Sequence, residues 1–166
     1  VHLAGQNYRR SGPLRGIAID GDGCEHVADK AADRVWHWCP SNPHQSTFTP
    51  LVKPIGLFWE AESNLLYTSM LGNGGEVVAL DLMDLRNGSL LSGVGGVLGA
   101  LRTVRRFNHL GMAHPAGMVV HGQTLYVLEQ QTPSLLSFDV ASGEFVAKVL
   151  SGLPDRPEQI ILSDDC

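Results

Sequence analysis

The sequence predicts an all-β fold that is built from repeated units of four short antiparallel strands. A run of alternating apolar residues, opened in two copies by Pro-x-Gly, recurs with its anchor residue at positions 16, 56, 117 and 159. Each of the first three runs is followed by further β-rich runs, which are separated by turns rich in Gly, Asn, Asp and Ser. A period of about 40 residues with four strands per unit is typical of β-propeller blades.

The distances between the anchors define the units. They are 40, 61 and 42 residues, so the middle unit carries an insertion of about 20 residues, which repeat folds place in loops. We expect an outer strand of a preceding blade and three blades, followed by the first strand of a further blade: residues 1–10, 11–52, 53–111 with an inserted loop at about 84–102, 112–152, and 153–166. A propeller closes with at least four blades, so we expect an incomplete ring that belongs to a longer polypeptide.

Turns divide each unit into four expected antiparallel strands. In the first unit these are residues 16–20, 25–29, 34–38 and 47–52. In the second they are residues 56–60, 65–69, 76–81 and 103–108. In the third they are residues 117–121, 124–128, 135–140 and 145–150. The apolar residues alternate as they do in strands that bury one face.

Composition excludes several classes of function. The chain has 12 basic and 17 acidic residues among 166, which gives a net charge of −5. A nucleic-acid-binding or anionic-membrane surface needs clustered Lys and Arg, which this balance argues against. No apolar run reaches the about 18 residues of a membrane span, so we expect no membrane insertion by this segment.

The first unit resembles the NHL repeat. Residues 16–20 read Gly-Ile-Ala-Ile-Asp, and residues 26–36 form a hairpin similar to the Tyr-Val-Ala-Asp and Asn-x-Arg-Ile elements of that repeat. Residues 114–117 and 125–127 look like a degenerate copy, whereas residues 65–69 are equally similar to YWTD-type propellers. The resemblance implies a β-propeller. It implies no particular activity, because such repeats occur in adhesive, scaffolding and enzymatic proteins.

Two cysteines are placed to form a disulfide in the first unit. If the hairpin turns near Ala31 and Ala32, residues whose numbers sum to 63 face each other, and Cys24 lies opposite Cys39. Directly opposite Cβ atoms are about 4.5–5.5 Å apart, which is close to the disulfide range. We favour the disulfide over two free buried thiols. A disulfide predicts an oxidising compartment, and therefore an extracellular or secreted protein.

Cys166 is the third cysteine. It follows Gln159 at nearly the spacing at which Cys24 follows Gly16, so it would open the second strand of the next blade. We expect its partner outside this chain, on the continuation of that blade. The alternative is a bond between chains.

The inserted loop of the second unit carries a glycosylation sequon, Asn87-Gly88-Ser89. A surface loop of an extracellular chain is where such a sequon is used, so we predict that Asn87 is glycosylated. The following residues 90–101 are apolar and rich in Gly. We expect them either to fold over the blade or to pack against a partner.

A metal site is the alternative to a purely structural propeller. The strand that lines the channel has its fifth position at Asp20, Glu60, His121 and Ser163 in successive units. Propellers resembling peptidyl-hydroxyglycine lyases or calcium-dependent lactonases hold zinc or calcium in such rings. The simpler interpretation, which we favour, is that these residues end their strands and accept hydrogen bonds from turn amides.

We therefore predict a structural or protein-interaction module in a larger protein or assembly. Its expected partners are proteins or neighbouring copies, and no cofactor is expected. The chain has no Gly-x-Ser-x-Gly elbow and no phosphate-binding Gly pattern, so an enzyme is the less favoured hypothesis. The alternative function is a metal-dependent lyase or lactonase that uses Asp20, Glu60 and His121 with Ca or Zn in the channel.

Overall fold

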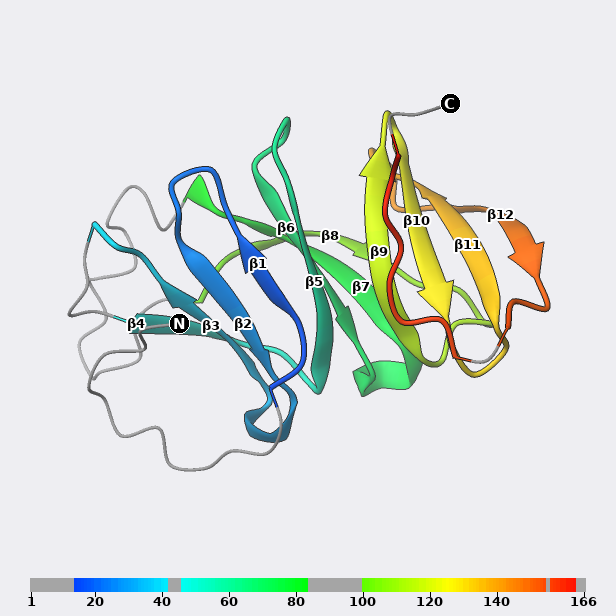
Figure 1. The fold of residues 1–166 in the computed structure, drawn as a ribbon, viewed down its shortest axis with the longest axis horizontal. Coiled ribbons are helices and arrows are strands. Elements are labelled where there is room, and N and C mark those ends of the chain that lie inside the picture. Colours follow the sequence, from blue (N-terminus) through cyan, green and yellow to red (C-terminus); the bar gives the residue numbers. More distant parts are fainter. Residues whose placement is uncertain (1–13, 42–45, 84–99, 155, 164–166) are drawn as a thin grey trace.

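The computed structural model describes residues 14–41, 46–83, 100–154 and 156–163. These residues form three antiparallel sheets of four strands each, in the orders β1-β2-β3-β4, β5-β6-β7-β8 and β9-β10-β11-β12 (Figure 1). The strands of the first sheet are Ile17–Ile19, Glu25–Asp29, Arg34–Trp38 and Ser46–Pro50. Those of the second are Pro54–Glu60, Leu65–Met70, Glu76–Asp81 and Thr103–Phe107. Those of the third are Pro115–His121, Thr124–Glu129, Ser134–Asp139 and Phe145–Ser151.

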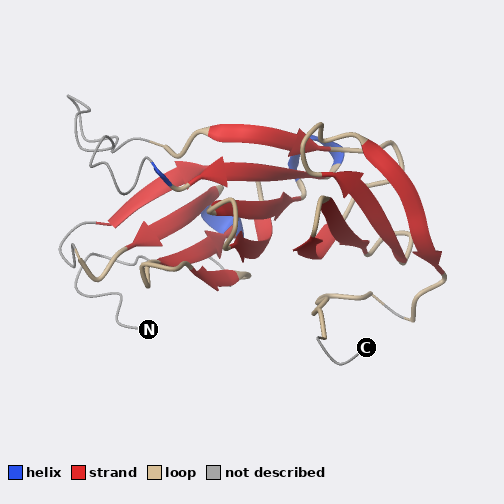
Figure 2. Cartoon of the chain, turned by 90° about the horizontal axis from the view of Figure 1, so that it is seen from above, coloured by secondary structure: helices blue, strands red, loops and turns tan. Residues whose placement is uncertain are grey.

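Strands account for most of the described chain (Figure 2). Two short 3-10 turns connect strands within a sheet: Lys30–Ala32 joins β2 to β3, and Gly72–Gly74 joins β6 to β7. Each sheet is a meander in which successive strands are neighbours. This is the blade architecture that the repeat period predicts, with every expected strand of the three complete units present. No helix in the described part of the chain is long and apolar enough to cross a membrane.

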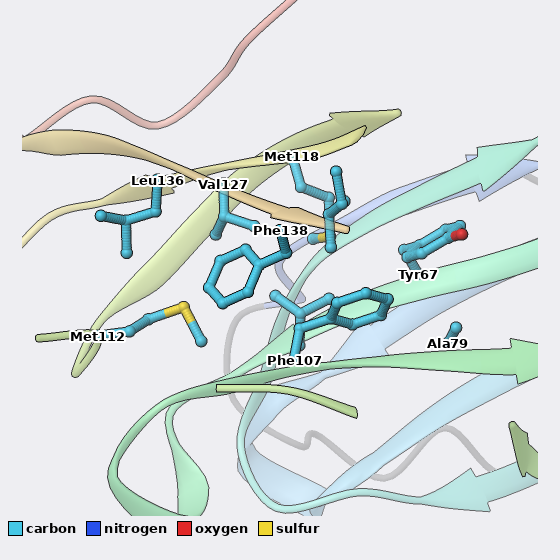
Figure 3. Close-up of a cluster of buried hydrophobic side chains, with 10 residues drawn as sticks. Tyr67, Ala79, Phe107, Met112, Met118, Val127, Leu136 and Phe138 are labelled. Carbon is cyan, nitrogen blue, oxygen red and sulfur yellow. The ribbon is translucent and has the colours of Figure 1, made fainter. Parts of the chain in front are cut away.

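The apolar core lies between neighbouring sheets. One cluster joins the second and third sheets, where the Phe107 ring lies 5.9 Å from that of Tyr67 and 6.1 Å from that of Phe138, measured between centroids (Figure 3). A second cluster joins the first and second sheets through Val35, Leu66 and other buried side chains. Burial of each large apolar side chain contributes about 1.5–3 kcal/mol, so these clusters hold the blades in a fixed arrangement.

The pairing of β2 with β3 confirms the predicted hairpin register. Glu25 pairs with Trp38 and Asp29 with Arg34, so paired residue numbers sum to 63 throughout. The turn is the 3-10 element Lys30–Ala32, and Asp33 closes it in the left-handed conformation with φ of 51°. The Asp29 side chain accepts a hydrogen bond from the Ala32 amide at 3.1 Å and so fixes the turn.

The repeated glycine has a steric role that explains the repeat. A Cβ atom added at Gly16 would lie under 3.0 Å from the carbonyl oxygen of Ile55, and one added at Gly56 would lie equally close to that of Ala116. Each of these carbonyls belongs to the residue just before the next anchor. The backbones of neighbouring inner strands therefore touch at these two anchors, and only glycine leaves room for this approach.

The same contact continues beyond the third blade. A Cβ atom at Gly117 would lie under 3.0 Å from the carbonyl oxygen of Glu158, the residue before the fourth anchor, Gln159. Residues 156–163 run beside β9 but have no regular strand structure (Figure 1). A β-strand is assigned from its hydrogen bonds to a neighbouring strand. No second strand of a further blade, with which residues 156–163 could pair, lies in the described part of the chain. The assignment of 153–166 to a further blade, like that of 1–10, stays a prediction.

Candidate functional site

A groove lies between the inner strands of the three blades. β1, β5 and β9 are each the first strand of their sheet, with a hydrogen-bonded neighbour on one side. The anchor contacts place them in the order β1, β5, β9, followed by residues 157–161. The groove that they line has a volume of about 580 Å³. This is in the range of about 300–1,000 Å³ that is usual for ligand sites.

One end of the groove is basic. Arg15 precedes β1, Lys30 follows β2, and Arg156 precedes the segment beside β9; all three line the groove. None of them forms an ion pair with another residue that the structure describes. Glu158 is the acidic residue among the described residues of the lining, and His114 lies at the same end, immediately before β9. We call the part formed by Arg15, Lys30 and Arg156 the basic end of the groove.

The rest of the groove is largely apolar. Ile17 is 52% exposed and Ile161 is 86% exposed, and they lie on opposite walls. Phe58 of β5 and Met118 of β9 form part of the floor. The groove therefore offers apolar contact beside a positive charge, on strands that the core clusters hold in place.

A network of buried polar side chains crosses the first blade beside its contact with the second. His26 Nε2 lies 3.3 Å from Asp20 Oδ2, and His26 Nδ1 lies 2.9 Å from His37 Nδ1. His37 Nε2 lies 2.8 Å from Thr49 Oγ1, which accepts a hydrogen bond from the Leu101 amide at 3.0 Å. All four side chains are nearly inaccessible to solvent. This network of side chains therefore connects the turn after β1 and strands β2, β3 and β4 with the segment that leads into β8.

The carboxylate fixes the first hydrogen bond of this network. An ionised Asp20 only accepts hydrogen bonds, so His26 donates from Nε2. One of the two facing Nδ1 atoms donates to the other, and His37 Nε2 is paired with the hydroxyl of Thr49, which can donate or accept. Each donor in the series meets one acceptor, which is the condition under which a buried polar network stabilises a fold.

The pKa values of two groups agree with this arrangement. Burial lowers the pKa of His37 well below its usual value, and the neighbouring His26 lowers it further. Burial alone would raise the pKa of Asp20, but hydrogen bonds from His26 and from the amides of Cys24 and Asp22 outweigh it and lower this pKa. The network therefore holds a neutral His37 and an ionised Asp20.

The predicted disulfide lies at the end of the same hairpin. Cys24 and Cys39 are bonded, with Cα atoms 4.1 Å apart. The Cys24 amide donates to Asp20 Oδ1 at 2.9 Å, so the disulfide and the polar network share the turn after β1. Cys166 and Asn87, the other two residues for which the sequence predicts a covalent modification, lie outside the described residues.

The residues of the metal hypothesis occupy the ends of inner strands. Asp20 accepts from the amides of Asp22 and Cys24, and Glu60 accepts from the amides of Glu62 and Ser63. His121 ends β9 and is exposed. Within residues 14–41, 46–83, 100–154 and 156–163, no group of three or more His, Cys, Asp or Glu side chains is arranged to hold a metal ion.

Sequence reasoning missed both the groove and the histidine pair. The residue numbers of His26 and His37 also sum to 63, so the register that pairs the two cysteines already places these histidines opposite each other. The basic end had no comparable signal. Its three cations are far apart in sequence and meet only because the inner strands converge.

Comparison with solved structures identifies the fold. No protein-family model and no curated protein sequence matches the chain. Virginiamycin B lyase from Staphylococcus aureus matches with a TM-score of 0.66 at 12% identity, over 95% of this chain and 48% of that one. Hydrazine synthase of Kuenenia stuttgartiensis matches with a TM-score of 0.65 at 15% identity, over 93% and 41%. The computationally designed Ika4 protein matches with a TM-score of 0.62 at 8% identity, over 95% and 84%.

The chain thus spans less than half the length of the two natural proteins. Both are of the β-propeller type, so this chain has the fold of β-propeller blades. At such identities the likeness extends to the fold alone, and it does not single out the NHL family among propellers.

Proposed function

We propose that this chain is part of an extracellular β-propeller that serves as a structural or protein-interaction module in a larger protein or assembly. The groove between its inner strands is the binding surface. One observation supports this most strongly: three inner strands converge on a preformed groove whose cations have no ionic partner among the described residues. Binding sites occur preferentially in such fixed concave surfaces with a few polar groups.

The rigidity of the blades favours a binding role. Ser69 Oγ accepts from the Gly56 amide at 2.9 Å and donates to the Ala116 carbonyl at 2.8 Å. This hydroxyl links β5 to β9 in addition to the apolar cluster. Groups held by such a frame lose little conformational freedom on binding, which favours affinity.

An extracellular location is supported by the disulfide between Cys24 and Cys39, since such bonds persist in oxidising compartments. Glycosylation of Asn87 and external pairing of Cys166 remain predictions of the same proposal. Completion of the ring by further blades is also part of it. The exposed side chains of Ile19 at one end of the array and of Leu162 at the other, which do not line the groove, support this completion.

The metal-dependent lyase or lactonase has less support. Virginiamycin B lyase shares the fold, but Asp20 and Glu60 already accept hydrogen bonds within their turns. An enzyme of that kind requires these oxygens for the metal. We therefore retain the interaction module.

Site-specific photocross-linking tests the proposed function. The photoreactive residue p-benzoylphenylalanine is placed at Ile17, in the groove, or at Val146 of β12, outside it; the two positions are 52% and 61% exposed. We expect cross-linked protein partners from Ile17 and few from Val146 when the protein is expressed in its own cells. Identical products from both positions, or none from Ile17, would contradict a groove-centred interaction module.

A further inference from the structure

We propose that the groove binds an acidic peptide segment, whose carboxylates contact Arg15, Lys30 and Arg156 while its apolar side chains contact Ile17 and Ile161. This inference rests on the proposed function, for which it supplies the chemistry of the partner. It is carried by the placement of the cations, the local charge and the free edges of the inner strands.

Backbone contacts bring the three cations to the same end of the groove. The Arg15 amide donates to the Ala28 carbonyl at 3.0 Å, so Arg15 lies beside the end of β2, which Lys30 directly follows. On the other wall, Gln130 Nε2 donates to the Pro157 carbonyl at 3.2 Å, and the Gln130 amide donates to the His114 carbonyl at 3.1 Å. Arg156 is therefore held near the start of β9, at the same end as the start of β1.

The charge of the groove is opposite to that of the chain. Among the described residues of its lining, the fixed charges are Arg15, Lys30 and Arg156 against Glu158, a local excess of positive charge, whereas the chain carries −5. An acidic ligand is repelled by most of the surface and attracted here. Such a contrast directs a charged partner to one place and penalises binding elsewhere.

The inner strands also present backbone groups to a peptide. β1, β5 and β9 are edge strands, and an edge strand has amides and carbonyls available for an added chain. Beside them lie the exposed side chains of Ile17 and Ile161. Alternating acidic and apolar residues in an extended peptide match a groove that has cations at one end and isoleucines on its walls.

The test uses two labelled peptides that differ only in charge. Acetylated Glu-Leu-Glu-Leu-Glu and Gln-Leu-Gln-Leu-Gln are titrated with the purified protein by fluorescence anisotropy at about 0.05 M salt, where screening is weak. We expect the acidic peptide to bind at least about fivefold more tightly, because each exposed charge pair contributes up to about 1 kcal/mol. Raising the salt to about 0.5 M should remove most of the difference.

A matched pair of variants locates the binding. Arg15→Gln/Lys30→Gln removes two cations of the basic end, and Arg105→Gln/Lys148→Gln removes one Arg and one Lys from β8 and β12, outside the groove. We expect the first variant to lose about fivefold in affinity for the acidic peptide, and the second to retain nearly all of it. Thermal unfolding checks that both variants remain folded.

Three outcomes overturn the inference: equal binding of both peptides, equal losses in both double variants, or no binding of the acidic peptide. Partner cross-linking from Ile17 would then still support an interaction module with a partner of other chemistry. If position 17 gave no cross-linked partner and the acidic peptide did not bind, the proposed function would be contradicted as well.

Discussion

Replacing Gly56 by alanine should separate the second and third blades. The added Cβ would lie 2.8 Å from Ser69 Oγ and 3.2 Å from Met118 Cε, and under 3.0 Å from the Ala116 carbonyl oxygen. Ordinary van der Waals contact begins at 3.4 Å, so the two inner strands would have to move apart. The Ala116 carbonyl and the Gly56 backbone cannot yield by side-chain rotation.

The expected cost has two parts. Overpacking of a close contact costs about 1–3 kcal/mol. The movement also weakens the hydrogen bonds of Ser69 with Gly56 and Ala116, each of which contributes about 1 kcal/mol. We therefore expect Gly56→Ala to lower the free energy of unfolding by about 4 kcal/mol, a large share of the roughly 5–15 kcal/mol of a typical domain.

Urea denaturation followed by circular dichroism measures this loss. Gly122→Ala is the matched control, because Gly122 has φ of 57° but nothing within 4 Å of an added Cβ. We expect the control to lose only about 1–2 kcal/mol, the cost of a left-handed alanine. If Gly56→Ala lowered the free energy of unfolding no more than Gly122→Ala, the contact between inner strands would not be the reason why position 56 requires glycine.

Three further predictions follow from the first blade and the inserted loop. Cys24→Ser/Cys39→Ser should lower the free energy of urea unfolding by about 3 kcal/mol, as expected for a closed loop with a sequence separation of 15; an unchanged midpoint would contradict this. Because burial makes the pKa of His37 lower in the folded state, its contribution to stability is complete above pH about 6.5 and declines as the pH falls below it. His37→Gln should reduce this acid-dependent loss in pH-resolved denaturation, and an unaltered slope would exclude His37 as its source. If Asn87 is glycosylated, protein secreted from eukaryotic cells should lose mass on glycosidase treatment, and Asn87→Gln should abolish that change.

The strands and the disulfide were predictable because they depend on local order. Alternating apolar residues and turn residues define β2 and β3, and the hairpin turn then fixes which residues face each other. That register predicts the bond between Cys24 and Cys39 without knowledge of the remaining fold. It also contains the pairing of His26 with His37, although ring contact depends on which face of the sheet is buried.

The groove required the arrangement of the blades. The anchor glycines were visible as a repeat, but their contacts with carbonyls of the next blade emerge only when inner strands lie side by side. The basic end combines Arg15, Lys30 and Arg156 from opposite walls of the groove. No spacing in the sequence encodes that meeting, because it depends on how successive blades pack.

Hydrogen–deuterium exchange tests most directly whether the inner strands are the binding surface. Amide exchange of the purified protein is measured with and without saturating acidic peptide, and peptic fragments covering β1, β5 and β9 are compared with those covering β4, β8 and β12. We predict slower exchange in the inner strands and in residues 156–161, with no change in the outer strands. Protection confined to the outer strands, or absent from the inner ones while the peptide is bound, would contradict the account.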